Sequence, residues 1–254
     1  MTATKTARAA QATKAAKVRK DTAKPATAPP PLIGLEAVES VPLHELVFAR
    51  LTRALMSGQI QPGRKLTSRK LALELGTSDM PVRAALARLQ ALKALVALPN
   101  GSLTLPPMTR ERFADLMSTR VICEGAATEI AAGLITKPQL RALQSEQDAL
   151  VRAARDQDID AFLARNYEFK FQVYQASRSG SLIFLIETLW LQVGPFLRQF
   201  SGRFEGGLEG VLDLDFHDEV LRALSRGDGP AAAAAMRKDI SSGGQFLMAH
   251  AAFA

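Results

Sequence analysis

The stretch LTSRKLALELGTSDMPVRAALARL, which runs from Leu66 to Leu89, decides the fold of this chain. Its first part has an apolar stripe that ends at Gly76, a typical helix stop, and consists of Leu71, Ala72 and Leu75. Its second part has another stripe at spacings of three and four residues, formed by Val82, Ala85, Leu86 and Leu89. Two short helices joined by a tight turn are therefore predicted. This is the layout of a helix-turn-helix, whose second helix enters the major groove of DNA.

The flanking residues extend this unit in both directions. A helix is expected over residues 42–57, ended by Gly58 and followed by a Pro62-Gly63 turn. Two strands are expected over residues 95–98 and 103–105, because Asn-Gly between apolar runs is a strong hairpin signal. Three helices followed by a hairpin predict a winged helix-turn-helix over residues 40–107.

Composition and charge bound the function. The chain has 254 residues, of which 47% are hydrophobic, so it is long enough for two domains with packed cores. Its single cysteine, Cys123, excludes an internal disulfide and a multi-thiolate zinc site. The net charge is +4 over residues 1–39, +6 over residues 40–107 and −3 over residues 108–254. The positive charge thus surrounds the helix-turn-helix, as expected of a DNA-binding half joined to a second domain.

The first 39 residues are expected to be a basic tail and lead-in. Residues 1–31 are mostly Ala, Thr, Lys and Pro, which bury too little apolar surface to offset the entropy of ordering. Seven basic side chains there add salt-sensitive DNA affinity or serve only as a solubilising arm. The sequence shows neither a signal peptide nor an apolar run of membrane-spanning length, so a cytoplasmic protein with no membrane partner is expected.

Residues 108–254 are predicted to be helical throughout. Helices are expected near residues 109–134, 137–155, 158–177, 181–203, 212–226 and 229–250, separated by glycine-rich breaks. Gly243 and Gly244 lie within the last of these and should weaken it by roughly 1 kcal/mol each. The predicted fold class is therefore mainly α, with a winged helix-turn-helix followed by an all-α bundle.

Both halves resemble one known family. GQIQPGRKLTSRKLALELGTSDMPVRAALARLQALKALVALPNGS resembles the winged-helix domain of GntR-type bacterial transcription regulators. The most specific parts are the Gly-X-Ile-X-Pro-Gly turn, the Leu-X-X-Arg-X-Leu-Ala helix and Pro-Val-Arg-X-Ala-Leu-X-Arg-Leu. NYEFKFQVYQASRSGSLIFLIETLW, DFHDEVLRALSRGD and AAAAAMRKDI resemble the FadR-type C-terminal domain, called FCD. That resemblance implies a helical bundle that binds an effector and dimerises.

The resemblance also implies DNA-binding residues. Arg69 would face a phosphate or base edge, Arg83 would lie on the recognition helix, and the wing tip would hold Asn100 and Gly101. The remaining candidates on or beside the recognition helix are Ser78, Asp79, Met80 and Arg88.

The chain departs from the family pattern at the start of the recognition helix. Asp79 and Met80 stand where the family has Arg and Thr, and Ala84 replaces a usual Glu. Asp79 either accepts a hydrogen bond from cytosine or caps the helix. In both cases the operator should differ from the common family operator.

Polar residues interrupt the apolar faces of several C-terminal helices. Arg120 and Glu124 lie on the first, Asn166 and Lys170 on the third, His217 on the fifth and Asp239 on the sixth. They are either unrelated boundary residues that reach water or the lining of one cavity. As a set they predict a cavity, with the effector-binding residues Arg120, Asn166, Lys170, His217 and Asp239.

The family often holds a divalent metal at positions that match Asn166, Lys170, His217 and Asp239. Only His217 is a standard ligand in its usual place, so neither a metal nor another cofactor is expected. Lys170 would replace the charge of the metal and pair with Asp239 or with an acidic ligand. Arg120 is the second candidate anchor, and a small carboxylate is the expected effector.

The sequence therefore predicts a regulator that binds double-stranded DNA and responds to a small anionic metabolite. It is expected to act as a homodimer on a pseudo-palindromic operator. One alternative is a DNA-binding protein whose C-terminal bundle only dimerises. Another is an enzyme that uses Lys170, His217 and Asp239 for acid–base chemistry. No nucleophile, metal or phosphate loop accompanies these residues, so no enzyme is expected.

Overall fold

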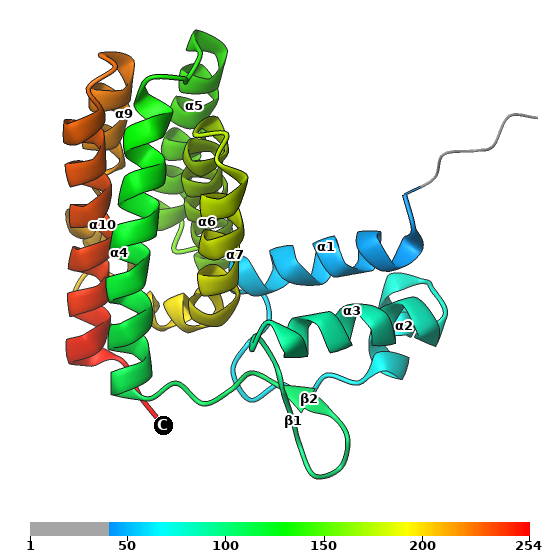
Figure 1. The fold of residues 1–254 in the computed structure, drawn as a ribbon. Coiled ribbons are helices and arrows are strands. Elements are labelled where there is room, and N and C mark those ends of the chain that lie inside the picture. The colour runs from blue at the N-terminus through cyan, green and yellow to red at the C-terminus, as the bar shows by residue number, and fades with distance from the viewer. Residues whose placement is uncertain (1–40) are drawn as a thin grey trace, which may run out of the picture. The chain divides into compact units, whose positions relative to one another are not determined.

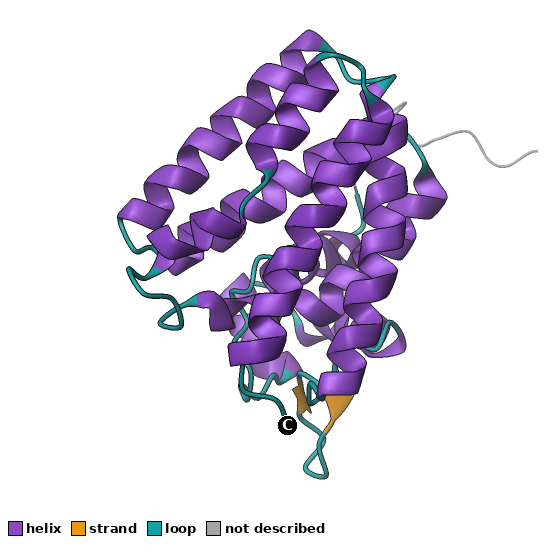
Figure 2. Cartoon of the chain, turned by 90° about the vertical axis from the view of Figure 1, so that its left-hand side faces the viewer, coloured by secondary structure: helices purple, strands orange, loops and turns teal. Residues whose placement is uncertain are grey.

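The computed structural model describes residues 41–254 (Figure 1), and the predicted basic tail lies outside them. The first part of this range contains α1 (Leu43–Met56), α2 (Ser68–Leu75), α3 (Asp79–Ala91), β1 (Val96–Ala97) and β2 (Leu103–Thr104). The second part contains α4 (Arg110–Ala132), α5 (Lys137–Arg155), α6 (Ile159–Ala176), α7 (Gly180–Val193), η1 (Gly194–Phe200), α8 (Leu208–Val211), η2 (Leu212–Leu214), α9 (His217–Ser225) and α10 (Gly229–His250). Helices dominate and the strands are very short (Figure 2), so the predicted mainly-α class is confirmed.

The helix-turn-helix forms as the sequence predicts. The Thr67 hydroxyl caps α2 by accepting from the backbone N–H of Lys70 at 3.4 Å, and Gly76 ends the helix in the left-handed conformation with φ 63°. The inner stripe of α3 is almost completely buried and consists of Val82, Ala85, Leu86 and Leu89. Burial of this stripe fixes which side of α3 faces outward.

The wing is a short antiparallel hairpin. Val96 pairs with Thr104 and Ala97 with Leu103, so the regular strands are shorter than the predicted ranges 95–98 and 103–105. Leu103 also exchanges two backbone hydrogen bonds with Leu66, at 2.7 and 2.9 Å. This bridge joins the wing to the segment that precedes α2.

The C-terminal bundle differs from prediction in two places. The helix expected over 181–203 changes to a 3-10 helix at Gly194, where Pro195 lacks the N–H that an α-helix needs. A Cβ at Gly194 would lie 2.7 Å from the carbonyl oxygen of Met56, so the close approach of α1 requires glycine. The helix expected over 212–226 begins only at His217, after the short elements α8 and η2.

The glycines in α10 do not interrupt it. The helix continues through Gly243 and Gly244 along α4, its neighbour in Figure 1. A Cβ at Gly244 would lie 2.7 Å from Cε of Met117 on α4. The small residue therefore permits the close packing of two long helices that both supply residues to the cavity described below.

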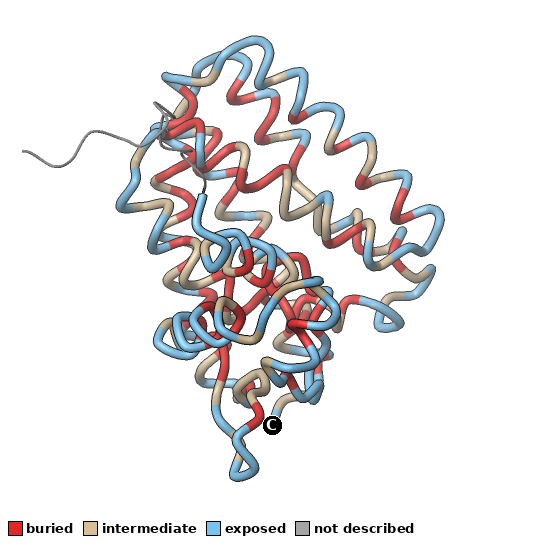
Figure 3. The backbone as a smooth tube through the Cα atoms, turned by 90° about the vertical axis from the view of Figure 1, so that its right-hand side faces the viewer, coloured by how far each residue is buried: buried red, intermediate tan, exposed pale blue. Residues whose placement is uncertain are grey.

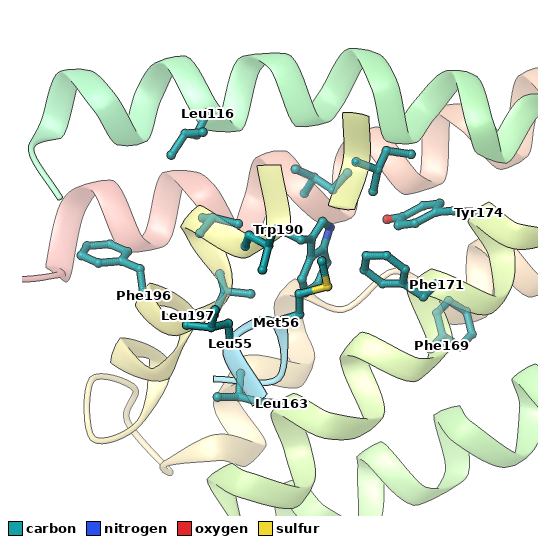
Figure 4. Close-up of a cluster of buried hydrophobic side chains, with 14 of the residues drawn as sticks. Leu55, Met56, Leu116, Leu163, Phe169, Phe171, Tyr174, Trp190, Phe196 and Leu197 are labelled. Atoms are coloured by element: carbon teal, nitrogen blue, oxygen red, sulfur yellow. The ribbon is translucent and has the colours of Figure 1, made fainter. Parts of the chain in front are cut away.

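The buried apolar residues form one core, and Figure 3 marks the buried positions along the backbone in red. At its centre Trp190 and Tyr174 are fully buried, with Phe169 and Phe171 beside them (Figure 4). Met56, at the end of α1, lies against Trp190 in the same view. The DNA-binding part and the bundle thus share part of one core within residues 41–254.

One segment has the length and composition of a membrane span, which differs from the sequence expectation. Within Gly180–Phe200 an 18-residue stretch has a mean hydropathy of 1.4, and 44% of that stretch is buried inside the molecule. Ile186 and Trp190 of this segment are completely buried against other helices, whereas Phe184 and Leu185 are exposed. Its place in the core therefore explains only part of the apolar character of this segment.

Candidate functional site

The outward side of α3 carries the main DNA-binding candidates. Arg83 and Ala84 lie three and four residues after Met80, Ala87 lies three and four residues after this pair, and all four are exposed. None of the ion pairs formed between residues 41 and 254 involves Arg83. Its guanidinium is thus available to a base edge or a phosphate.

The start of α3 corrects the prediction that Asp79 caps the helix. Ser78 occupies the N-cap position, although its side chain forms no capping hydrogen bond. Asp79 is the first helical residue, where the helix dipole favours a carboxylate. Its Oδ1 atom is buried without a hydrogen-bond partner among the described residues. Asp79 is therefore turned partly inward.

Arg88 differs from Arg83 although both lie on α3. Its Nη1 atom contacts both carboxylate oxygens of Glu45 on α1, at 2.9 and 3.2 Å. Its guanidinium also lies 3.8 Å from the ring centre of Phe48. Arg88 thus holds α3 against α1, and the sequence reasoning missed both of its partners.

The other DNA-binding candidates lie on α2 and in the wing. Arg69 is exposed near the start of α2. The Asn100 side chain accepts hydrogen bonds from the backbone N–H and the hydroxyl of Ser102, at 3.1 and 2.6 Å. Gly101 has a φ of 78°, which favours glycine. Asn100 and Gly101 therefore shape the tip of the wing, and both are exposed there.

All five residues predicted to bind the effector line one cavity in the bundle. Arg120 comes from α4, Asn166 and Lys170 from α6, His217 from α9 and Asp239 from α10. The cavity offers about 60 Å³ to the centres of water-sized molecules. The remaining wall is largely apolar and includes Met117, Leu150, Phe162, Leu163, Leu197, Phe200, Val211, Leu214 and Ile240.

Arg120 is neutralised within the chain. Its Nε and Nη2 atoms donate to Glu124 at 2.5 and 3.3 Å, and both side chains are almost fully buried. Glu124 also accepts from the Tyr174 hydroxyl and from Nε1 of Trp190, the latter at 3.0 Å. Burial and the Glu124 carboxylate raise the pKa of Tyr174 well above its ordinary value, so its hydroxyl keeps the proton that it donates. Four side chains thus form one closed network.

Lys170 is also paired. Its ammonium group donates to Oδ2 of Asp239, and the two side chains are only 4% and 10% exposed. Oδ1 of Asp239 accepts from the backbone N–H of Phe216 at 3.0 Å. Burial works to raise the pKa of Asp239, but Lys170, His217 and the Phe216 N–H together lower it below its ordinary value. Asp239 is therefore held as a carboxylate.

His217 is fixed in place by residues that the sequence reasoning missed. Its Nδ1 atom lies 2.8 Å from Oε1 of Gln147, and Nε2 of Gln147 donates to Asp215 at 2.9 Å. The His217 ring stacks on Phe169 with a centroid separation of 3.9 Å. Gln147 interrupts an apolar face of α5 between Leu143 and Leu150, which is the same signal that identified the other polar residues.

Three side chains beside Lys170 could serve as metal ligands. Asp215, His217 and Asp239 offer three ligand atoms within 4.8 Å of one another. However, Asp215 accepts from Gln147 and from the backbone of His217, while Asp239 is bound to Lys170. A lysine ammonium at coordination range repels a divalent cation. Only Nε2 of His217 lacks a hydrogen-bond partner among the described members of this cluster.

Two family models match the chain. The model described as bacterial regulatory proteins, gntR family, matches residues 43–104, and the model of the FCD domain matches residues 115–242. HTH-type transcriptional regulator McbR of Escherichia coli (strain K12) is 31% identical over 164 residues, which cover 65% of this chain and 74% of that protein. A protein of Paenarthrobacter nicotinovorans, named "Probable D-xylose utilization operon transcriptional repressor", is 25% identical over 67% of this chain and 74% of its own length.

Solved structures agree with these matches. E. coli McbR/YncC superposes with a TM-score of 0.73 and 27% identity, over 80% of this chain and 95% of that one. A GntR-type transcriptional regulator from Rhodococcus sp. RHA1 has the same fold, with a TM-score of 0.62 and 20% identity over 82% of this chain and 98% of that one. The matched domains and relatives are regulators and not enzymes. The chain therefore belongs to the GntR family of DNA-binding transcription regulators, in the FadR-type group that carries an FCD domain.

Proposed function

We propose that this regulator is a homodimer that binds a pseudo-palindromic operator and responds to a small anionic metabolite held without a metal. The observation that carries the proposal is the convergence of Arg120, Asn166, Lys170, His217 and Asp239 on one cavity. These residues come from four helices, and the other half of the chain is a DNA reader. A DNA partner also supports the expected cytoplasmic location.

The ion pairs favour Lys170 as the anchor of the anion. Arg120 donates to both carboxylate oxygens of Glu124, and the same oxygens accept hydrogen bonds from Tyr174 and Trp190. Lys170 has one carboxylate partner, Asp239, at the cavity wall. An incoming carboxylate therefore replaces Asp239 at Lys170 and leaves the Glu124 network intact.

The volume of the cavity limits the size of the effector. The cavity of about 60 Å³ holds on the order of four to six water molecules, at roughly 10–15 Å³ each. This space matches a small carboxylic acid. The apolar wall accommodates its hydrocarbon part.

Exposed apolar side chains support the homodimer. Ile122 and Ile130 lie on α4, Leu134 lies just after its end, and Phe184 and Leu185 lie on the neighbouring helix α7. Burying them against a second copy removes apolar surface from water, and a dimer matches the two-fold symmetry of a palindromic operator. Analytical ultracentrifugation tests this point, because a monomer at micromolar concentration contradicts it.

A thermal-shift screen of small carboxylic acids, followed by DNA binding with and without each hit, tests the effector proposal. An acid should raise the melting temperature and change operator affinity. Lys170→Ala should abolish the shift, whereas Lys238→Ala should not, because Lys238 is exposed and pairs with Glu219. Protein purified without chelator should contain much less than one divalent metal per chain. A full equivalent of metal, or normal acid binding by Lys170→Ala, contradicts the proposal.

A bundle that only dimerises remains the alternative. It predicts that no acid in the screen shifts the melting temperature, and that Lys170 and Asp239 form a permanent ion pair in the core. The same screen therefore distinguishes the two functions.

A further inference from the structure

Between Met80 and Ala87 the outward side of the recognition helix carries almost no polar side chains, and the exposed Gln90 follows nearer its C-terminal end. Met80, Arg83, Ala84 and Ala87 form its exposed stripe, and Arg83 alone offers hydrogen bonds. Met80 is 80% exposed, which is unusual for a large apolar side chain. The surface that enters the groove is thus one cation surrounded by apolar groups.

The neighbouring acidic residue does not supply the missing polarity. Asp79 lies at the first position of α3, and its Oδ1 atom is buried. Asp79 as a whole is half-buried, whereas Met80 beside it is exposed. Met80 is therefore the side chain that projects further from the start of α3.

The edges of base pairs in the major groove offer hydrogen-bonding groups and one apolar group, the C5-methyl of thymine. Residues near the N-terminus of a recognition helix contact these edges. A methionine side chain is flexible and polarizable, so it packs readily against a methyl group. An exposed Met80 matches thymine in the same way that Arg83 matches guanine.

We propose that Met80 reads the methyl group of a thymine in each operator half-site, close to a guanine bound by Arg83. Ala84, one turn further along α3, packs against the same apolar patch of the groove. The inference rests on the DNA-binding function and deepens it, because it names the chemistry by which this chain selects its operator.

A thymine-to-uracil scan tests the inference, because uracil lacks only the methyl group. The full chain selects its operator from random duplexes, and each thymine of the enriched duplex is then replaced in turn. At one position per half-site, the wild-type protein should lose about fourfold in affinity for each methyl removed. Met80→Ala should bind the thymine duplex more weakly and should be nearly indifferent to that replacement.

Leu73→Ala is the matched control. Leu73 is 84% exposed on α2, so this substitution removes an apolar side chain similar to that of Met80 from outside the exposed stripe of α3. This variant should lose as much affinity as the wild-type protein when that thymine is replaced by uracil. The inference is overturned when the wild-type protein binds every uracil duplex as tightly as its parent. The inference is also overturned when Met80→Ala loses as much affinity as the wild-type protein on replacement of thymine by uracil at each position. An enriched duplex without two-fold symmetry contradicts the proposed dimeric operator instead, and the scan on that duplex still decides the role of Met80.

Discussion

The outward side of α3 and the cavity of the FCD domain hold basic residues in opposite states. Arg83 is exposed and has no ion-pair partner among the described residues, whereas Arg120 and Lys170 are buried and each binds a carboxylate. Water stabilises an exposed charge until its partner binds, whereas a buried charge must be neutralised by another group of the same chain. DNA therefore binds to a surface that is already free. Under the proposed function, an anionic ligand in the cavity would have to displace Asp239 from Lys170.

The largest effect should come from Glu124, the acceptor at the centre of the closed network. Glu124→Ala leaves Arg120 as a buried unpaired cation and removes the acceptor of Tyr174 and Trp190. Breaking a buried ion pair in this way should lower the free energy of unfolding by about 3–5 kcal/mol. Urea denaturation measures this loss.

Glu124→Gln is the matched control for that experiment. It keeps an oxygen that accepts hydrogen bonds but removes the charge, so its loss should be smaller than that of the alanine variant. Equal stability of Glu124→Ala and the wild-type protein would show that the network contributes nothing to folding.

A loss of about 3 kcal/mol is expected for Lys170→Met, because Asp239 then lacks its cation and keeps only the Phe216 N–H as a direct donor. The folded-state pKa of Asp239 is lowered, so this carboxylate stabilises the wild-type fold above its unfolded pKa of about 3.9. That contribution is lost as the pH falls through the lower folded-state pKa. In the absence of Lys170, burial instead favours the protonated form of the Asp239 carboxyl group.

The difference in unfolding free energy between Lys170→Met and the wild-type protein should therefore narrow as the pH falls from 7 to 4. Denaturation curves recorded across that range measure the difference. Lys238→Met is the control, because this lysine adjoins Asp239 in sequence but lies in a half-exposed pair with Glu219. If the difference in unfolding free energy between Lys170→Met and the wild-type protein stays constant with pH, the assignment of Lys170 as the partner of Asp239 is contradicted.

Periodicity and capping signals predicted most of the fold. The ranges 137–155 and 229–250 coincide with α5 and α10, because both helices begin at a side-chain cap followed by a proline in the first turn. The change to a 3-10 helix at Gly194 has a local signal in Pro195, which the range predicted over 181–203 ignored. The need for glycine at position 194 depends on the approach of Met56 from a distant helix, and this contact is not visible in the local sequence.

The sequence predicted which residues line the candidate site, but it did not predict which of them form ion pairs with one another. Periodicity placed Asn166, Lys170, His217 and Asp239 on inward faces, and all of them line the cavity. Which carboxylate neutralises which cation depends on distances between helices, so the sequence left Lys170 open to Asp239 or to a ligand. Asp215 was missed because it lies in a short connection, where no helical period marks an inward side.

Arg83 should affect DNA binding without affecting stability. If it reaches a base edge, Arg83→Ala should weaken operator binding by about 1–3 kcal/mol and relax the preference at one position per half-site. Fluorescence anisotropy with wild-type and single-base variant operators measures both changes. An even loss across all sequences, with a flatter salt dependence, indicates a phosphate contact instead. An unchanged binding isotherm contradicts a role for Arg83 in either contact.

The smallest effect is expected for Arg88, and it sharpens the comparison within one helix. Arg88 pairs with Glu45 and lies over Phe48, so Arg88→Ala removes a contact between α3 and α1. The pair is 52% and 44% exposed, and solvent screening limits its contribution, so together with the cation–π contact the loss of stability should be about 1 kcal/mol. Operator affinity should change by less than about twofold, because the guanidinium faces α1 and not the groove. Thermal melts and operator titrations of Arg88→Ala and Arg83→Ala, made side by side, separate the two roles. If Arg88→Ala keeps full stability and loses affinity as Arg83→Ala does, then Arg88 leaves α1 to bind DNA, and the distinction between a free and a paired arginine on α3 fails.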